Sequence, residues 1–195
     1  MPAPLPVLRP ASPRFEDGLA FARYLDQAAE GYFRLMLGRR AGEIVATAFA
    51  RPGHDLSHEH ATFAELDGLI VGMASAFTAA EHRRSSFDPV REAAGPGNLR
   101  MRIVRGLFAP MLRIIDSIDD DAFYVLAIAV DEALRGHGIG SVLLDSLEAR
   151  GRARGLNRLA LDVSAANETA RRFYEGRGIT VRQCYGTADA GNIAY

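Results

Sequence analysis

The order of hydrophobic and polar positions along the first half of the chain predicts alternating helices and strands. Residues 5–9 predict a short opening strand, which prolines interrupt on both sides. Polar residues with apolar residues at helical spacing predict helices over 16–29 and 43–50. Two strand-like runs, 61–66 and 69–77, flank Asp67-Gly68, a pair that favours a tight β-hairpin.

The second half shows a more regular alternation of strands and helices. Residues 122–130 are almost all apolar, which is typical of a strand buried on both faces. The pattern that follows predicts four further elements. They are a helix over 138–154, a strand over 159–163, a short helix over 167–175 and a last strand over 179–185.

Residues 83–121 separate these halves and have a different character. Proline and glycine mark an irregular stretch, and a helix is predicted over 99–118 with Ile103, Leu107, Met111 and Ile114 near one face. We expect that face to pack in the core or against a second copy of the chain. The segment is interpreted as a helical insertion within one domain that spans residues 1–195.

Composition excludes several classes of protein. The chain has 195 residues, 48% of them hydrophobic, and a formal net charge of −1, so no global field would recruit nucleic acid or an anionic membrane. The chain has one cysteine, Cys184, which is interpreted as a buried hydrophobic residue rather than a catalytic thiol. No signal peptide or membrane-spanning run is predicted, so we expect a cytoplasmic protein.

A glycine-rich turn follows the buried strand and carries the clearest chemistry. It reads Arg135-Gly136-His137-Gly138-Ile139-Gly140-Ser141 and opens the predicted helix. Glycines let the backbone approach a ligand closely, and the free N–H groups of a helix start favour phosphate. A dinucleotide-binding motif places its first glycine directly after the strand, whereas residues 131–135 intervene here.

These residues resemble the GNAT superfamily of N-acetyltransferases. Its signature is Arg or Gln, two residues, Gly, one residue, then Gly or Ala, and Arg135, Gly138 and Gly140 satisfy it. A second match is independent of the first and lies in the helix after the next strand. It consists of Asn167, Ala170, the pair Phe173-Tyr174, and Gly178.

The resemblance implies a fold, a co-substrate and a set of site residues. The fold would be α/β, with a mixed, mostly antiparallel central sheet flanked by helices. Acetyl-CoA would bind where strands 122–130 and 159–163 part, with a bulge near Ala129, and Tyr174 would return a proton to the CoA thiolate. The implied cofactor-binding residues are Ile128, Ala129, Val130, Arg135, Gly136, His137, Gly138, Ile139, Gly140, Ser141, Asn167, Ala170, Phe173 and Tyr174.

The general base is not identified by the resemblance. Some relatives have a glutamate where Tyr124 stands here, and a neutral phenol is a poor base. Glu81 and His82 are candidate substitutes near the end of the second hairpin strand.

Two other polar clusters were weighed for a functional role. His54, Asp55, His58, Glu59 and His60 are interpreted as a polar loop, and no metal is expected. The acidic run Asp116, Asp119, Asp120 and Asp121 is interpreted mainly as a solvated loop, with attraction of a cationic acceptor as the alternative.

The sequence therefore predicts direct transfer of an acetyl group from acetyl-CoA to a primary amine of a small molecule or peptide. The main alternative is a catalytically silent acyl-CoA-binding sensor, because the glutamate is missing. The sequence does not exclude an acyl donor other than acetyl-CoA, and it does not exclude a homodimer. The helix over 99–118 could cover the acceptor cleft.

Overall fold

The computed structural model describes residues 5–96, 99–107, 118–180, 183–185 and 192–194, and all structural statements concern these residues. Their strands pair in one sheet with the order β1-β2-β3-β4-β5-β7-β6. Only β4 and β5 run parallel, and the other neighbours are antiparallel. The strands are β1 Val7–Pro10, β2 Ala61–Leu66, β3 Leu69–Thr78, β4 Ala122–Val130, β5 Arg158–Ser164, β6 Gln183–Tyr185 and β7 Asn192–Ala194.

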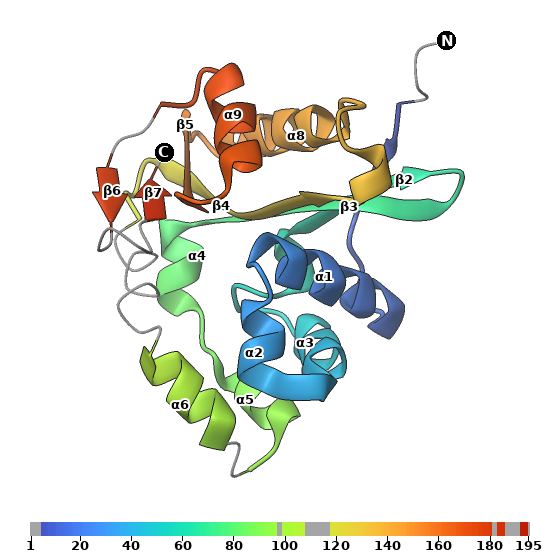
Figure 1. Ribbon diagram of the computed structural model, residues 1–195, viewed down its shortest axis with the longest axis vertical. Coiled ribbons are helices and arrows are strands. Elements are labelled where there is room, and N and C mark those ends of the chain that lie inside the picture. Colours follow the sequence, from blue (N-terminus) through green and yellow to red (C-terminus); the bar gives the residue numbers. More distant parts are fainter. Residues whose placement is uncertain (1–4, 97–98, 108–117, 181–182, 186–191, 195) are drawn as a thin grey trace.

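Helices cover both faces of this sheet (Figure 1). The helices of one face are α1 Phe15–Ala28, α2 Tyr32–Leu37, α3 Ala41–Phe49, α4 Ala79–Arg84, α5 Asp88–Ala94 and α6 Leu99–Leu107. The other face carries α8 Ile139–Ala153 and α9 Glu168–Gly176. Two buried apolar clusters fill the two layers, one around Phe21, Phe49 and Phe63, the other around Leu143, Leu144 and Leu147. The predicted mixed, mostly antiparallel α/β fold is confirmed.

The β2–β3 hairpin forms where the sequence predicts it. Leu66 pairs with Leu69, so the two-residue loop is Asp67-Gly68. Both loop residues have positive φ, 50° and 77°, as a type I′ turn requires. Asp and Gly tolerate this backbone conformation, which explains why this pair marks the turn.

The parallel pairing between β4 and β5 ends early. Their register runs from Ala122↔Arg158 to Val125↔Leu161. Beyond that point β4 continues to Val130, while β5 pairs along its other edge with β7, from Asp162↔Ala194 onward. The two strands therefore separate after Val125, and one edge of β4 is left without β5.

The region predicted as a helical insertion holds several short helices. α4 begins at Ala79, before the expected boundary, and α5 and α6 follow. Pro89 occupies the first turn of α5, and Gly95, with φ 81°, ends it. The predicted helix over 99–118 is confirmed from Leu99 to Leu107, and Met111 and Ile114 lie outside the described residues.

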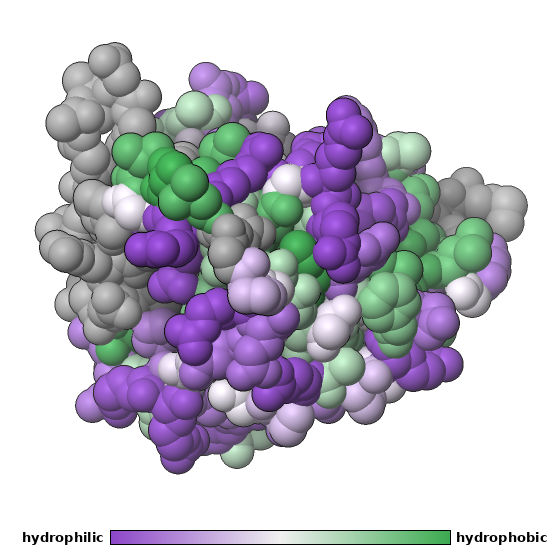
Figure 2. Space-filling view, turned by 90° about the horizontal axis from the view of Figure 1, so that it is seen from below, coloured by the Kyte–Doolittle hydropathy of each residue, from purple (hydrophilic) through white to green (hydrophobic). Residues whose placement is uncertain are grey.

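The buried face of α6 differs from the predicted one. Met101 and Val104 are buried and pack against the α1–α3 layer, whereas Ile103 and Leu107 are 53% and 73% exposed. The core alternative for Ile103 and Leu107 is therefore wrong, because α6 rests on α2 by its opposite side, and packing of this face against a second copy stays a prediction. Figure 2 views this side of the molecule and shows hydrophobic residues gathered in patches within a mainly hydrophilic surface.

Four elements escaped the sequence analysis, namely α2, α4, α5 and β7, and one strand is shorter than predicted. α2 forms between Gly31 and Gly38, and β7 pairs between β5 and β6. The predicted strand over 179–185 is a strand only over Gln183–Tyr185; Ile179 and Thr180 are not in it, and 181–182 lie outside the described residues.

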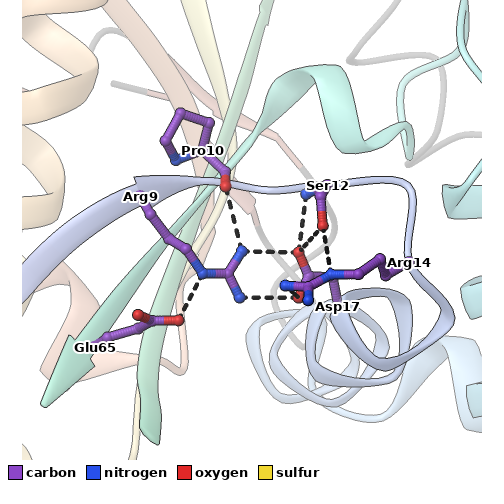
Figure 3. Close-up of polar contacts among 6 residues, drawn as sticks. All are labelled: Arg9, Pro10, Ser12, Arg14, Asp17 and Glu65. Carbon is purple, nitrogen blue, oxygen red and sulfur yellow. Dashed lines mark hydrogen bonds and ion pairs between the residues drawn. The ribbon is translucent and has the colours of Figure 1, made fainter. Parts of the chain in front are cut away.

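A polar network ties the opening strand to the first helix (Figure 3). Arg9 of β1 donates to both carboxylate oxygens of Asp17 in α1, at 2.8 Å each, and to Glu65 of β2 at 2.6 Å. The Asp17 carboxylate also accepts from the backbone and side chain of Ser12. Burial favours the neutral form of Asp17, but the hydrogen bonds from Arg9 and Ser12 outweigh it and lower its pKa to about 2.

No helix in the described ranges combines the length and apolar character that crossing a lipid bilayer requires.

Candidate functional site

A cavity of about 630 Å³ opens beyond the carboxyl end of β4. Residues of α1, β4, the glycine-rich turn, α8 and α9 line it. It thus lies where β4 continues without β5. The residues predicted for the cofactor all line it except His137; they are Ile128, Ala129, Val130, Arg135, Gly136, Gly138, Ile139, Gly140, Ser141, Asn167, Ala170, Phe173 and Tyr174.

The glycine-rich turn presents main-chain donors to this cavity. Gly136 and Gly138 have φ 78° and 84°. This is a left-handed backbone conformation that residues other than Gly, Asn and Asp rarely adopt. Gly138 is the N-cap of α8 and supplies no side-chain cap. The first N–H groups of a helix have no partner within that helix, so those of Ile139, Gly140 and Ser141 are placed for an anion.

Two arginines add positive charge at the cavity wall. Arg135 precedes the turn and is exposed, and Arg172 lies on α9. Arg172 also pairs with Glu168 at 2.8 Å, which reduces its contribution. The His137 side chain lies against the Arg135 carbonyl, with Nδ1 at 3.0 Å, and His137 is not among the residues that line the cavity, so its contact with the cofactor stays a prediction.

Helix α9 closes one side of the cavity. Asn167 is its N-cap, and the side-chain oxygen of Asn167 accepts from the Ala170 N–H at 3.1 Å. This oxygen therefore caps the helix, a different role from the ligand contact that the sequence predicts. A Cβ at Gly140 would lie 3.5 Å from the Phe173 ring, an ordinary van der Waals distance, so α8 and α9 are neighbours at this point.

Tyr174 lies at the junction of cavity and core. Its side chain is buried in the cluster under α8, and its ring lies 5.0 Å from that of Phe173, centroid to centroid. Burial raises the pKa of Tyr174 above its usual value. The phenol is therefore neutral at physiological pH and retains a proton that it can donate.

A bulge in β4 lies where its pairing with β5 ends. Ser75 pairs with Ala127 and Ala76 with Val125, so Leu126 is the extra residue in β4. The predicted position near Ala129 is wrong, because the irregularity falls where the parallel pairing ends. The Asp131 N–H donates to the Val71 carbonyl on β3. The main-chain groups of successive residues in a strand point to alternate edges, so those of Val130 and Ile128 point to the edge away from β3.

Helix α1 contributes residues that the sequence analysis missed. Gln27 and Ala28 line the cavity, and Gln27 donates to the Val130 carbonyl at 3.0 Å. Leu134, Thr169 and Arg172 were also missed. Thr169 and Arg172 could have been found, since they lie on the same short helix as the motif residues. Nothing in the sequence around Gln27 indicates a ligand contact.

The candidate bases lie on the α4 side of the sheet. Glu81 forms a capping box with Thr78, accepting from the Thr78 N–H at 2.7 Å, so its carboxylate is engaged at a helix start. This use disfavours Glu81 as a base. His82 pairs through Nδ1 with Asp55 at 2.8 Å and stacks on Phe77. Tyr124 is buried and donates to Asp162 at 2.8 Å.

The histidine cluster of residues 54–60 has structural roles. His54 is buried, accepts from the Leu56 N–H and lies 2.9 Å from the Ala48 carbonyl; burial lowers its pKa, so it is neutral. His58 lies against the Phe49 carbonyl, and Glu59 accepts from the Gly53 N–H. Among the described residues, no group of three or more His, Cys, Asp or Glu is arranged to hold a metal ion.

The acidic run before β4 is largely paired with arginines. Asp119 and Asp121 bind Arg158, and Asp120 binds Arg83 at 2.6 Å. These pairs reduce the negative charge available to attract an acceptor. Asp116 lies outside the described residues, as does the Cys184 side chain.

Comparison with known proteins agrees with this geometry. The family model described as "Acetyltransferase (GNAT) family" matches residues 8–179. A search among curated proteins found no significant match.

Solved structures share the fold. The structure described as an acetyltransferase superposes with a TM-score of 0.68 at 24% identity, covering 96% of this chain and 97% of that chain. An N-acetyltransferase from Staphylococcus aureus Mu50 gives 0.66 at 16% identity, covering 96% and 98%. A GNAT-family acetyltransferase from Streptococcus pneumoniae gives 0.52 at 18% identity, covering 97% of each chain. Because the family model covers most of the sequence, the chain belongs to the GNAT family of acetyltransferases.

Proposed function

We propose that this protein is an N-acetyltransferase that moves an acetyl group from acetyl-CoA directly to a primary amine. The observation that carries the proposal is the cavity at the carboxyl end of β4, which joins the glycine-rich turn, the free edge of β4 and the Tyr174 phenol. Its volume of about 630 Å³ falls within the usual range of ligand sites.

Three parts of the cavity fit three parts of acetyl-CoA. The N–H groups of residues 139–141, with Arg135, suit a diphosphate. Main-chain groups of Ile128 and Val130 suit the amides of the pantetheine arm, which would lie along β4 like an added strand. Gln27 already occupies the Val130 carbonyl, so this side chain would shift or share that contact.

The same arrangement places chain groups around the reacting carbon. The Ile128 N–H would donate to the thioester oxygen as it gains negative charge. The amine nitrogen forms a bond to the carbonyl carbon, the carbon–sulfur bond breaks, and the amine loses one proton. Neutral Tyr174 would then protonate the departing thiolate.

Two glycines at opposite ends of α8 supply a matched test of the phosphate site. Gly138 and Gly155 both have positive φ, 84° and 77°, and both have open space where a Cβ would stand, but only Gly138 lines the cavity. Gly138→Glu should raise the KM for acetyl-CoA by about tenfold or more, since it adds negative charge beside the phosphates. Gly155→Glu carries the same backbone strain and charge and should leave this KM unchanged.

Thiol release from acetyl-CoA against a panel of primary amines measures both variants and separates the two candidate functions. Turnover that depends on an added amine supports the transferase. Acetyl-CoA that raises the melting temperature of the wild type without turnover on any amine supports the sensor instead. Equal KM values for the two glycine variants would refute the phosphate site.

The acceptor is proposed to be a small molecule or peptide carrying a primary amine. It would approach from the α4 side of the sheet, because α8 and α9 cover the other side. The described part of α6 packs on α2, so these residues do not support the suggestion that this helix covers the acceptor cleft.

A further inference from the structure

The point where β4 and β5 separate holds a carboxylate that the family motifs do not mark. Asp162 is the first residue of β5 beyond the last parallel pair, Val125↔Leu161. Its neighbours Leu161 and Val163 are buried in the core under α8. Side chains alternate along a strand, so Asp162 faces the opposite side of the sheet, where α4 lies.

Tyr124 of β4 is hydrogen-bonded to this carboxylate across the point where the two strands separate. Phe123 and Val125 face α8, so Tyr124 points to the same side as Asp162. Its hydroxyl donates to Oδ2 of Asp162 at 2.8 Å, and its ring packs on Phe77 with centroids 5.5 Å apart.

Several buried oxygen atoms on this face of the sheet could each accept a further hydrogen bond. Within the described part of the chain, Oδ1 of Asp162, Oδ1 of Asp55 and the hydroxyl of Ser75 are buried without a hydrogen-bond partner. Asp55 acts electrostatically on Tyr124, and Ser75 lies on β3 on the same face as Phe77. Buried acceptors without donors are costly, so the site favours a ligand that brings N–H groups.

We propose that Tyr124 and Asp162 together form the proton acceptor of the transfer. The phenol oxygen receives the proton of the attacking amine while the phenol passes its own proton to Oδ2 of Asp162. This inference rests on the proposed function and names the base and the acceptor chemistry of the same site.

The relay balances without an external reactant. The neutral amine contributes its lone pair to the new carbon–nitrogen bond, and the sulfur takes the electrons of the broken carbon–sulfur bond. One amine proton ends on Asp162 through Tyr124, and the thiolate takes a proton from Tyr174. Solvent then returns Asp162 and Tyr174 to their starting states.

The surroundings explain why two residues are needed. Burial raises the pKa of Tyr124 well above its usual value, so a phenolate does not form and the phenol alone is a poor base. Burial also raises the pKa of Asp162, although the hydrogen bond from Tyr124 opposes this. The other titratable groups facing the pair from neighbouring elements are Asp55 with His82, His60 with Glu81, and Tyr174.

A second Tyr–Asp pair, in which the tyrosine is buried, provides the control. The Tyr24 hydroxyl lies 2.9 Å from Oδ1 of Asp131, which directly follows β4, whereas Tyr124 lies near the start of that strand. Tyr124→Phe and Asp162→Asn should each lower kcat by about 100-fold or more, in the range of lost general base catalysis, with the KM for acetyl-CoA unchanged. Tyr24→Phe removes the corresponding phenol contact to an aspartate and should leave kcat within about twofold of the wild type.

The pH profile distinguishes a relay from a structural role. The wild-type kcat should fall on the acid side as Asp162 is protonated, and this limb should disappear in Asp162→Asn. Acetyl-CoA should raise the melting temperature of Tyr124→Phe as much as that of the wild type, which shows that the cofactor site is intact. A wild-type kcat in Tyr124→Phe overturns the relay alone, whereas no amine-dependent turnover in the wild type overturns the proposed function.

Discussion

Tyr174 illustrates how burial prepares a single side chain for its proposed role. A raised pKa keeps its proton available across the neutral range and makes the phenol a weaker acid. Since a thiolate is a good leaving group, Tyr174→Phe should lower kcat by only about tenfold, at the low end of acid catalysis. The ring still packs against Phe173, so the KM for acetyl-CoA should change little.

Thiol release from pH 7 to pH 10 checks the charge state of Tyr174. In the wild type, kcat should not decline through loss of the Tyr174 proton near the usual tyrosine pKa of about 10. A decline centred below that value, absent from Tyr174→Phe, would contradict a raised pKa.

Helix α1 shows how one element links packing to the site. Its residues Gln27 and Ala28 line the cavity, while Gly18 lies against α3. A Cβ at Gly18 would stand 2.7 Å from Cα of Ala46, a backbone atom that cannot move by itself. Gly18→Ala should therefore destabilise the protein by about 2 kcal/mol, as overpacked cores do, and displace α1.

Urea denaturation measures this cost, with Gly106→Ala as the matched control. Gly106 lies within α6 and has no heavy atom within 4 Å of an added Cβ, so alanine there should be neutral or stabilise the protein by up to about 1 kcal/mol. Equal stability of the two variants would contradict the close approach of α1 and α3.

Elements that are specified by neighbouring residues in the sequence could be predicted, whereas contacts between distant residues could not. β2 and β4 have their predicted bounds, and the Asp67-Gly68 turn forms as expected, because local alternation and turn chemistry specify them. The glycine-rich turn and α9 carry short motifs, so most of their cavity residues were found. Gln27 and Asp162 were missed because only tertiary structure brings them to the site.

In the molecule as a whole, the sheet separates the two proposed substrates. In the proposed function, α8, α9, the glycine-rich turn and the end of α1 would hold acetyl-CoA, and the acceptor would approach from the layer containing α4 (Figure 1). Under the same proposal, the two substrates would meet where β4 and β5 separate. The bulge at Leu126 and the last parallel pair at Leu161 both lie at this point of the sheet.

The Arg9–Asp17 network stabilises the acceptor-side layer as a unit, because it joins β1, β2 and α1 (Figure 3). The pKa of Asp17 falls from 3.8 to about 2 on folding, so its ionised form stabilises the folded state. This contribution is full above about pH 4 and is lost as pH falls toward 2. From the shift, it amounts to about 2 kcal/mol.

Asp17→Asn should therefore lower the free energy of unfolding at pH 7 by about 2 kcal/mol or more, since Arg9 would keep a partly buried charge without this partner. The variant should also lose that much less stability than the wild type between pH 4 and pH 2. Urea unfolding at pH 7, 4 and 2.5 measures both effects. Glu16→Gln, at the exposed neighbouring position, should change neither, and a parallel pH dependence in wild type and Asp17→Asn would refute the assigned role.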